Sequence, residues 1–154
     1  MDIVPNEWLL DYLNPASDPR KRRFVVDFLN SLWKNGHRIV IGRSTKFGSK
    51  FHRFMKEFGY CPGTKAALSM LSKAFYDSEK TMLIESPERL CGEISKKAPE
   101  DDEYLLELGF SSNDKLIVTT DRRLKERCNG VDGIQILLIG ELINELKLDL
   151  VAPE

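Results

Sequence analysis

The hydrophobic positions of the chain fall into short unbroken runs separated by longer amphipathic stretches. The runs at Asp2–Val4, Arg38–Ile41, Leu116–Val118 and Ile134–Ile139 are mostly β-branched, which predicts strands. Thr81–Ile84 fits either a further strand or an extended link. Runs of this kind are typical of parallel strands that are covered on both faces.

Between these runs, apolar residues recur every three or four positions, which predicts helices. Asp18-Pro19 is a typical helix start, and Gly36 is a typical C-terminal signal. The predicted helices are Glu7–Leu13, the segment from Pro19 to Gly36, Phe47–Phe58, Thr64–Phe75, Glu88–Lys97, Asp101–Leu108, Arg122–Cys128 and Gly140–Leu146.

The alternation of strands and helices predicts an α/β fold. We expect a three-layer α/β/α sandwich with a mostly parallel central sheet. The sequence contains no internal repeat, no low-complexity segment and no linker rich in Pro, Gly or Ser. Residues 1–154 are therefore expected to form a single domain.

The composition is that of an ordinary globular protein, with 42% apolar and 31% charged residues and a formal net charge of -1. This charge gives no overall attraction to nucleic acid, so any such binding requires a local patch. No apolar run is long enough to span a bilayer, and the N-terminus lacks the pattern of a signal peptide. A cytoplasmic protein with no membrane partner is expected. Three dispersed cysteines and two histidines make a zinc site improbable.

The most basic stretch runs from Gly42 to Lys56 and interleaves basic with aromatic residues. The phenylalanines at 47, 51, 54 and 58 have helical spacing, which favours a core position over base stacking. The basic residues form either a solvated helix face or a phosphate-binding face. Gly48-Ser49-Lys50 lacks the Gly-Lys-Ser/Thr order of a phosphate loop, which excludes that class of nucleotide site.

Two carboxylates mark positions where chemistry is usual in α/β proteins. Asp121 follows the strand at 116–118, and Asp102 begins the helix before that strand. Asp is a preferred helix N-cap, so a capping role alone would explain Asp121. However, ligands of open α/β sheets bind at the carboxyl ends of the strands, where the N-termini of the preceding helices also lie. The same topology brings Asn6 and Glu7, which follow the first strand, to this edge.

Clustered oxygen ligands without Cys or His are typical of Mg²⁺ or Mn²⁺ sites. Such a site can activate water for phosphoryl transfer. We therefore expect Asp102 and Asp121 to bind Mg²⁺ or Mn²⁺, with Asn6 or Glu7 completing the ligands.

The order of these motifs resembles the PIN-domain family of metal-dependent ribonucleases. Asp102 to Gly109 is similar to the family's acid-led helix, and Thr119-Thr120-Asp121-Arg122-Arg123-Leu124 to its Thr-x-Asp-x-x-Leu strand end. Gly133–Ile136 resembles the closing strand, and Ile3–Leu10 resembles the opening strand more weakly. The resemblance spans the chain and is most specific from Pro99 to Leu146.

The resemblance implies phosphodiester hydrolysis in RNA, with Asp102 and Asp121 as catalytic metal ligands and Thr119 as a positioning residue. Basic residues would hold the RNA backbone, namely Arg43, Lys46, Lys50 and Arg53. Family members are often toxins of toxin–antitoxin pairs and form dimers, so RNA, an antitoxin or other protein partner, and a homodimer are the partners that the resemblance implies.

The sequence departs from the family pattern at two acidic positions. Asn6 stands where the family has its first Asp, and Ser49 or Lys50 stands where it has its second acid. Two hypotheses follow. The chain is either an endoribonuclease that uses Mg²⁺ or Mn²⁺, or a catalytically inactive PIN-like module that binds RNA or a protein partner and has a weak metal site or none.

Overall fold

A five-stranded sheet forms the centre of the computed structural model, which describes residues 1–154. Its strands follow the order β3-β2-β1-β4-β5, and every neighbouring pair is parallel. The strands are β1 (Asp2–Pro5), β2 (Arg38–Gly42), β3 (Thr81–Ile84), β4 (Leu116–Thr119) and β5 (Gln135–Leu138). The α/β prediction is therefore confirmed, and the segment left open at 81–84 is a strand paired with β2.

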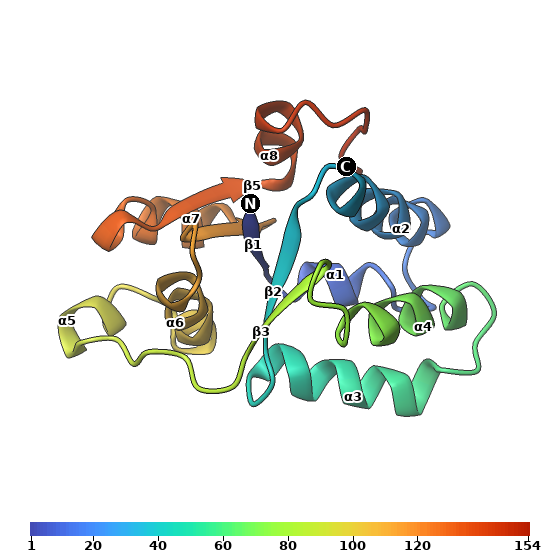
Figure 1. Cartoon of the computed structure of the whole chain (residues 1–154), viewed down its shortest axis with the longest axis horizontal. Coiled ribbons are helices and arrows are strands. Elements are labelled where there is room, and N and C mark those ends of the chain that lie inside the picture. The colour runs from blue at the N-terminus through green and yellow to red at the C-terminus, as the bar shows by residue number, and fades with distance from the viewer.

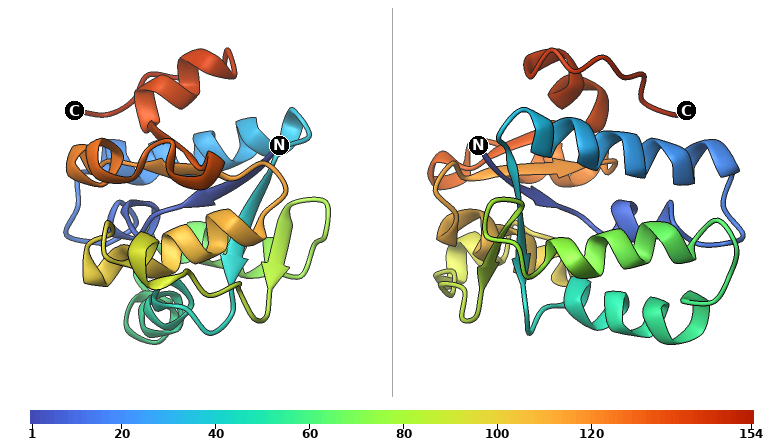
Figure 2. Two further views of the ribbon diagram at one scale, coloured as in Figure 1. Left: turned by 90° about the vertical axis from the view of Figure 1, so that its left-hand side faces the viewer. Right: turned by 45° about the vertical axis from the view of Figure 1, so that its right-hand side comes forward.

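Helices cover both faces of this sheet (Figure 1), which confirms the three-layer sandwich. Residues of α1, α2, α3, α4 and α8 pack in one core, while α6 and α7 pack in the other. Figure 2 shows α2 and α4 beside each other in the first of these layers. No helix combines the length and the apolar character needed to cross a membrane. The helices are α1 (Trp8–Asp11), α2 (Pro19–Lys34), α3 (Lys46–Phe58), α4 (Lys65–Ala74), α5 (Gly92–Ser95), α6 (Glu103–Ser111), α7 (Arg122–Cys128) and α8 (Ile139–Glu145), with 3₁₀ turns η1 (Glu100–Asp102) and η2 (Val131–Gly133).

The strands supply both cores because successive side chains point to opposite faces of a sheet. Ile3 packs in the core with α2, and its neighbour Val4 packs in the core with α6. In β4, Leu116 packs in the core with α2 and Ile117 in the core with α6. All four residues are fully buried. Burial on both faces explains why these strands are continuous apolar runs in the sequence.

The strand order creates a switch point between β1 and β4. The chain runs outward from β1 to β2 and β3, returns to β4 on the other side of β1, and continues outward to β5. The connections on the two sides of this point therefore lead away from each other. In open α/β sheets, a crevice for ligands forms at the carboxyl ends of the strands at such a point.

The helix predicted at Glu88–Lys97 is wrong in length, because only the single turn of α5 forms there. Gly92 falls within the segment, and only Leu90 and Ile94 contact the core. A glycine in the middle of a helix is unfavourable, and two apolar residues bury too little surface to offset it. The core position is confirmed for Phe47, Phe51 and Phe54, which are buried, whereas Phe58 at the end of α3 is only partly buried and packs against the core from its edge.

A buried carboxylate holds the amino-terminal edge of the sheet. Asp2 is 4% exposed, and its carboxylate accepts hydrogen bonds from Arg38 at 2.7 and 2.9 Å and from Asn113 Nδ2 at 2.7 Å. Burial alone would raise the pKa of Asp2. The hydrogen bonds from Arg38 and Asn113, with the charge of Arg38, outweigh burial and hold this pKa below its ordinary value.

Asp2→Asn is therefore expected to lower the free energy of unfolding at pH 7 by about 1–3 kcal/mol, because Arg38 loses its charged partner. A lowered native pKa stabilises the fold above the unfolded pKa of about 3.9 and ceases to do so as the pH falls through the native value. Urea unfolding of both proteins at pH 7 and pH 3 measures the effect. Asp27→Asn, which removes the exposed pair of Asp27 with Arg23, is the control and should change stability little. An equal loss for Asp2→Asn at both pH values would contradict this explanation.

Candidate functional site

The chain segment that follows β1 is fixed directly to β4. The backbone N–H of Asn6 donates to the carbonyl of Val118 at 3.1 Å, and the indole N–H of Trp8 donates to the same carbonyl at 3.1 Å. Trp8 is buried against Phe24 and Phe28. These contacts hold Asn6 and Glu7 at the switch point.

The hydroxyl of Thr119 joins the ends of β1 and β4. Its Oγ1 atom accepts a hydrogen bond from Asn6 Nδ2 at 3.1 Å and another from the backbone N–H of Asp121 at 3.0 Å. Thr119 is fully buried, so water does not compete for these bonds. These bonds join Asn6 and Asp121 at one edge of the sheet, while the catalytic positioning role that the family resemblance implies for Thr119 stays a prediction.

Asp121 is the N-cap of α7. Its Oδ1 atom accepts hydrogen bonds from the backbone N–H groups of Arg123 at 2.8 Å and Leu124 at 3.3 Å. The predicted capping role is therefore confirmed. Oδ2 makes no hydrogen bond or ion pair within the chain, so one carboxylate oxygen remains available to a ligand.

Asp102 is the predicted site residue with the least compensated charge. It ends the turn η1 and precedes α6, and it is partly buried. Its backbone N–H donates to the Pro99 carbonyl at 2.8 Å, but its carboxylate makes no hydrogen bond or ion pair within the chain. Burial raises the pKa of Asp102, and the nearby charge of Asp121 raises it further. Glu7 and Asp101 act in the same direction, while Lys46 opposes them. The charge of Asp121 is close enough to contribute to the raised pKa of Asp102, while their convergence on a shared ligand stays a prediction.

Glu7 lies at the same edge, where two lysines of α3 neutralise it. Lys46 Nζ is 3.4 Å from Glu7 Oε2, and Lys50 Nζ is 3.3 Å from Glu7 Oε1. Lys50 also pairs with Asp11 at 2.5 Å, and Lys46 with Asp101 at 3.7 Å. We call these five residues the Glu7–lysine cluster. Of the open alternatives Ser49 and Lys50, it is Lys50 that contacts this edge.

Gly48 allows α3 to approach the end of β2 closely enough to form this cluster. A Cβ atom at Gly48 would lie 2.6 Å from the carbonyl oxygen of Arg43 and 3.2 Å from that of Gly42. Thr45 caps the same helix end. The first turn of α3, which carries Lys46 and Lys50, therefore lies closer to the end of β2 than a residue with a side chain at position 48 would allow.

The remaining basic residues that were predicted to contact RNA lie elsewhere on the surface. Arg43 pairs with Glu85 at 3.2 Å, with both side chains more than half exposed. Arg53 makes no ion pair and lies with its guanidinium carbon 6.0 Å from the centre of the Phe54 ring. Of the predicted RNA-binding residues, Arg53 alone has no acidic partner within the chain.

Sequence reasoning missed Tyr104, which it assigned to the apolar face of a helix. The Tyr104 hydroxyl is buried and has no hydrogen-bond partner. Burial raises the pKa of this phenol, and the charges of Glu7, Asp102 and Asp11 add to the rise. The Tyr104 hydroxyl is therefore a hydrogen-bond donor without an acceptor. In the sequence, the only indication of its position near the carboxylates is that it lies two residues after Asp102.

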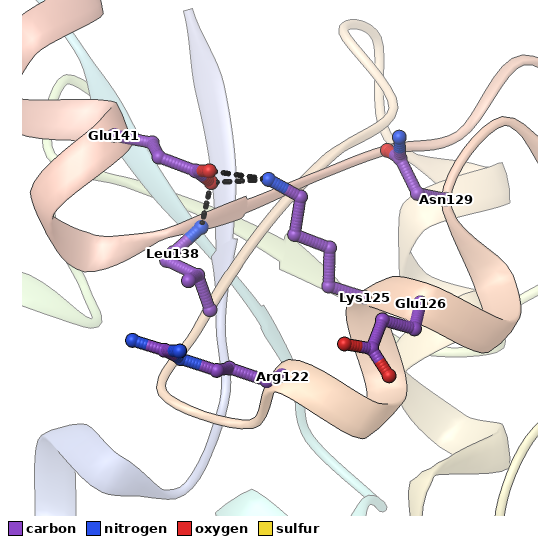
Figure 3. A pocket seen from close by; sticks show the side chains of 6 residues that line it. All are labelled: Arg122, Lys125, Glu126, Asn129, Leu138 and Glu141. Atoms are coloured by element: carbon purple, nitrogen blue, oxygen red, sulfur yellow. Dashed lines mark hydrogen bonds and ion pairs between the residues drawn. The ribbon is translucent and has the colours of Figure 1, made fainter.

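Sequence reasoning also missed Arg122, which follows Asp121 directly and lines a surface cavity of about 560 Å³ between α7 and the start of α8 (Figure 3). Arg122 extends beneath Leu138 and makes no ion pair within the chain, whereas Lys125 pairs with Glu141. Glu141 also accepts a hydrogen bond from the backbone N–H of Leu138 at 2.7 Å. The cavity adds a free guanidinium beside Asp121 but does not include either candidate carboxylate.

Asp102 and Asp121 are the predicted ligands at this edge of the sheet that could hold a metal ion. No group of three or more His, Cys, Asp or Glu side chains is arranged to hold a metal ion. Mg²⁺ is, however, commonly held by one or two carboxylates together with water and substrate phosphates. Asp102, which has no partner, and the free oxygen of Asp121 meet this requirement. Glu7, bound by two lysines, does not, and Asn6 Oδ1 already accepts from the Glu7 backbone N–H at 2.6 Å.

Comparisons of the chain with protein-family models, with curated proteins and with solved structures found no match.

Asp102→Asn is expected to raise stability in EDTA at pH 7 by up to about 1 kcal/mol, because it removes an unpaired charge from a partly buried position. A carboxyl group with a raised native pKa destabilises the fold only once the pH rises above the unfolded pKa, so the gain should vanish at pH 3. Thermal unfolding at both pH values measures it. A variant no more stable than the wild type at pH 7 would contradict the assigned environment.

Gly48→Ala is expected to destabilise the protein by about 1–3 kcal/mol, because the added methyl group meets backbone oxygens that move only with the helix. Gly140 in α8 provides a matched control, since a Cβ there has no atom within 4 Å. Gly140→Ala should stabilise the protein by about 0.5–1 kcal/mol through the greater helix propensity of Ala. Urea unfolding of the two variants should give opposite signs. The same sign for both would show that the approach of α3 to β2 is not restrictive.

Proposed function

We propose that this chain is a PIN-like endoribonuclease that uses Mg²⁺ or Mn²⁺ to hydrolyse RNA phosphodiester bonds at the crevice between β1 and β4. The observation that carries the proposal is the unpaired, partly buried carboxylate of Asp102 beside Asp121 at the switch point of the sheet. Unneutralised carboxylates in proximity are unfavourable unless a cation binds them. The resemblance of residues 99–146 to PIN-domain nucleases supports the choice of reaction.

Each residue at the crevice has a distinct role in this proposal. Asp102 and the free oxygen of Asp121 would hold the cation, which would supply charge stabilisation and activation of water when bound. Thr119 keeps Asn6 and Asp121 in register through its two hydrogen bonds. Tyr104 lies behind this edge with its hydroxyl buried, so it would act only through the electrostatics of the neighbouring carboxylates and not by contact with the substrate.

Two arginines without an acidic partner support a polymeric substrate. Arg122 follows Asp121 in the chain and lines the cavity next to α8, and Arg53 lies farther away on α3, so both are free to contact phosphates of an extended substrate. Backbone contacts of this kind are independent of sequence and weaken as salt rises. We therefore expect cleavage without strong sequence preference and with marked salt dependence.

The test is cleavage of single-stranded RNA in Mn²⁺ by the wild type, Asp102→Asn, Asp121→Asn and Asp101→Asn. Loss of either proposed ligand should lower the cleavage rate by at least about a hundredfold, in line with the barrier lowering that a bound metal provides. Asp101 is the matched control because its side chain is 87% exposed and adjoins Asp102. Asp101→Asn should therefore cleave at close to the wild-type rate.

A calorimetric titration with Mn²⁺ separates binding from cleavage. The wild type should bind Mn²⁺, and Asp102→Asn should not. If the wild type neither binds Mn²⁺ nor cleaves RNA, the nuclease proposal fails.

A second candidate function is a catalytically inactive PIN-like module that binds RNA or a protein partner. The Glu7–lysine cluster favours it, because lysine ammonium groups already satisfy one of the acids at the crevice. In that case RNA affinity should be unchanged by EDTA and by Asp121→Asn, and Arg122→Ala should weaken it. An antitoxin or other protein partner and a homodimer stay predictions from the family resemblance.

A further inference from the structure

We propose that Lys50, together with Lys46, is an internal cation that occupies the Glu7 end of the site, so that a divalent ion binds only at the Asp102–Asp121 end. This inference rests on the proposed function for the location of the metal. In this inference, α3 determines both the position and the number of the metal ions that bind.

Both oxygens of Glu7 are already paired with ammonium groups. Lys50 Nζ lies 3.3 Å from Oε1, and Lys46 Nζ lies 3.4 Å from Oε2. The side chains of Glu7 and Lys50 are each only 16% exposed, so solvent screens this pair less than an ordinary surface ion pair. Glu7 therefore presents no free oxygen to an incoming cation.

Helices α1 and α3 place the acidic and basic residues of this cluster opposite one another. Glu7 and Asp11 are four residues apart at α1, and Lys46 and Lys50 are four residues apart on α3, so each pair lies on one helix face. Lys50 bridges the two acids, with Asp11 at 2.5 Å. Its Nζ atom also lies 5.9 Å from the centre of the Phe54 ring, which packs along the lysine.

The position of α3 makes the arrangement a property of the fold. Phe47 and Phe51 bury one face of the helix, and Gly48 fixes its approach to β2. Lys46 and Lys50 each precede one of these phenylalanines, and their side chains extend from the adjacent face of α3 toward Glu7 and Asp11. The position of α3 thus places the Lys50 ammonium group within reach of Glu7.

These ion pairs divide the crevice into two electrostatically different ends. A divalent cation at Glu7 would meet two positive charges, which repel it strongly at such distances. Asp102 and Asp121 make no ion pair, so a cation placed there meets uncompensated carboxylates. If the lysines only joined two helices, their removal would change stability without changing metal binding.

The experiment compares Mn²⁺ binding to the wild type, Lys50→Met and Lys50→Glu by calorimetry and by electron paramagnetic resonance of free Mn²⁺. Lys50→Met should bind Mn²⁺ about tenfold more tightly, which is the scale on which one neighbouring charge shifts an ionic equilibrium. Lys50→Glu should bind more tightly still or acquire a second Mn²⁺. Lys56→Met is the matched control, since Lys56 is exposed on the same helix without an ion pair, and it should bind as the wild type does.

Lys50→Arg keeps the positive charge and serves as a control for effects of substitution at position 50 that do not depend on charge. It should retain wild-type Mn²⁺ affinity, with circular dichroism in EDTA confirming that each variant is folded. If Lys50→Met does not fold, Lys50→Arg still tests the inference. Tighter Mn²⁺ binding by Lys50→Arg than by the wild type would overturn it, because the positive charge is unchanged in this variant.

The results separate this inference from the proposed function. Unchanged Mn²⁺ affinity in Lys50→Met and Lys50→Glu overturns the inference, while loss of binding in Asp102→Asn still supports the nuclease site. If the wild type binds no Mn²⁺ but Lys50→Met does, the lysines are shown to keep a cation from the Glu7 end, while the metal site at Asp102 and Asp121 and the proposed metal-dependent function fail.

Discussion

The hydroxyl of Thr119 is the contact on which the crevice depends. It accepts hydrogen bonds from the Asn6 side chain and from the Asp121 backbone, and so joins the ends of two strands that are far apart in sequence. Because Thr119 is fully buried, these bonds form in a low-dielectric environment where their loss would leave polar groups unsatisfied. The indole N–H of Trp8 adds a third link by donating a hydrogen bond to the carbonyl of Val118 in β4. The relative positions of Asn6 and Asp121 therefore follow from the sheet, and loop conformation contributes little.

The charges around this hydrogen-bonded junction differ between its α1–α3 side and its α6–α7 side, and this difference is the basis of the proposed function. On the α1–α3 side, Glu7 and Asp11 are neutralised by Lys46 and Lys50. On the α6–α7 side, Asp102 has no partner, and Asp121 uses only one oxygen as a helix cap. A purely structural cluster is expected to compensate its buried charges. The carboxylate charge on the α6–α7 side therefore has no partner within the chain, and the proposed function places its cation there.

Much of the fold was predictable because burial on both faces of a parallel sheet leaves a strong local signal. Continuous apolar runs such as Ile39–Ile41 and Leu116–Val118 are strands, and the caps at Asp18 and Asp121 mark helix starts. The prediction failed for Glu88–Lys97, where the sequence has helix formers but too few apolar residues to anchor them. Helical stability in proteins comes mainly from packing of an apolar face, and a polar segment interrupted by Gly92 has little of it.

By itself, the sequence determined the alternation of strands and helices, the capping role of Asp121 and the delivery of Asn6, Glu7, Asp102 and Asp121 to one edge of the sheet. These follow from periodicity and chain direction, which are local properties. Only the tertiary structure decided which charges meet. The pairing of Lys50 with Glu7 depends on how closely α3 approaches β2 at Gly48, and the unpaired hydroxyl of Tyr104 depends on the packing of α6. Such contacts join residues separated by tens of positions, and the energy that selects them comes from packing the whole core.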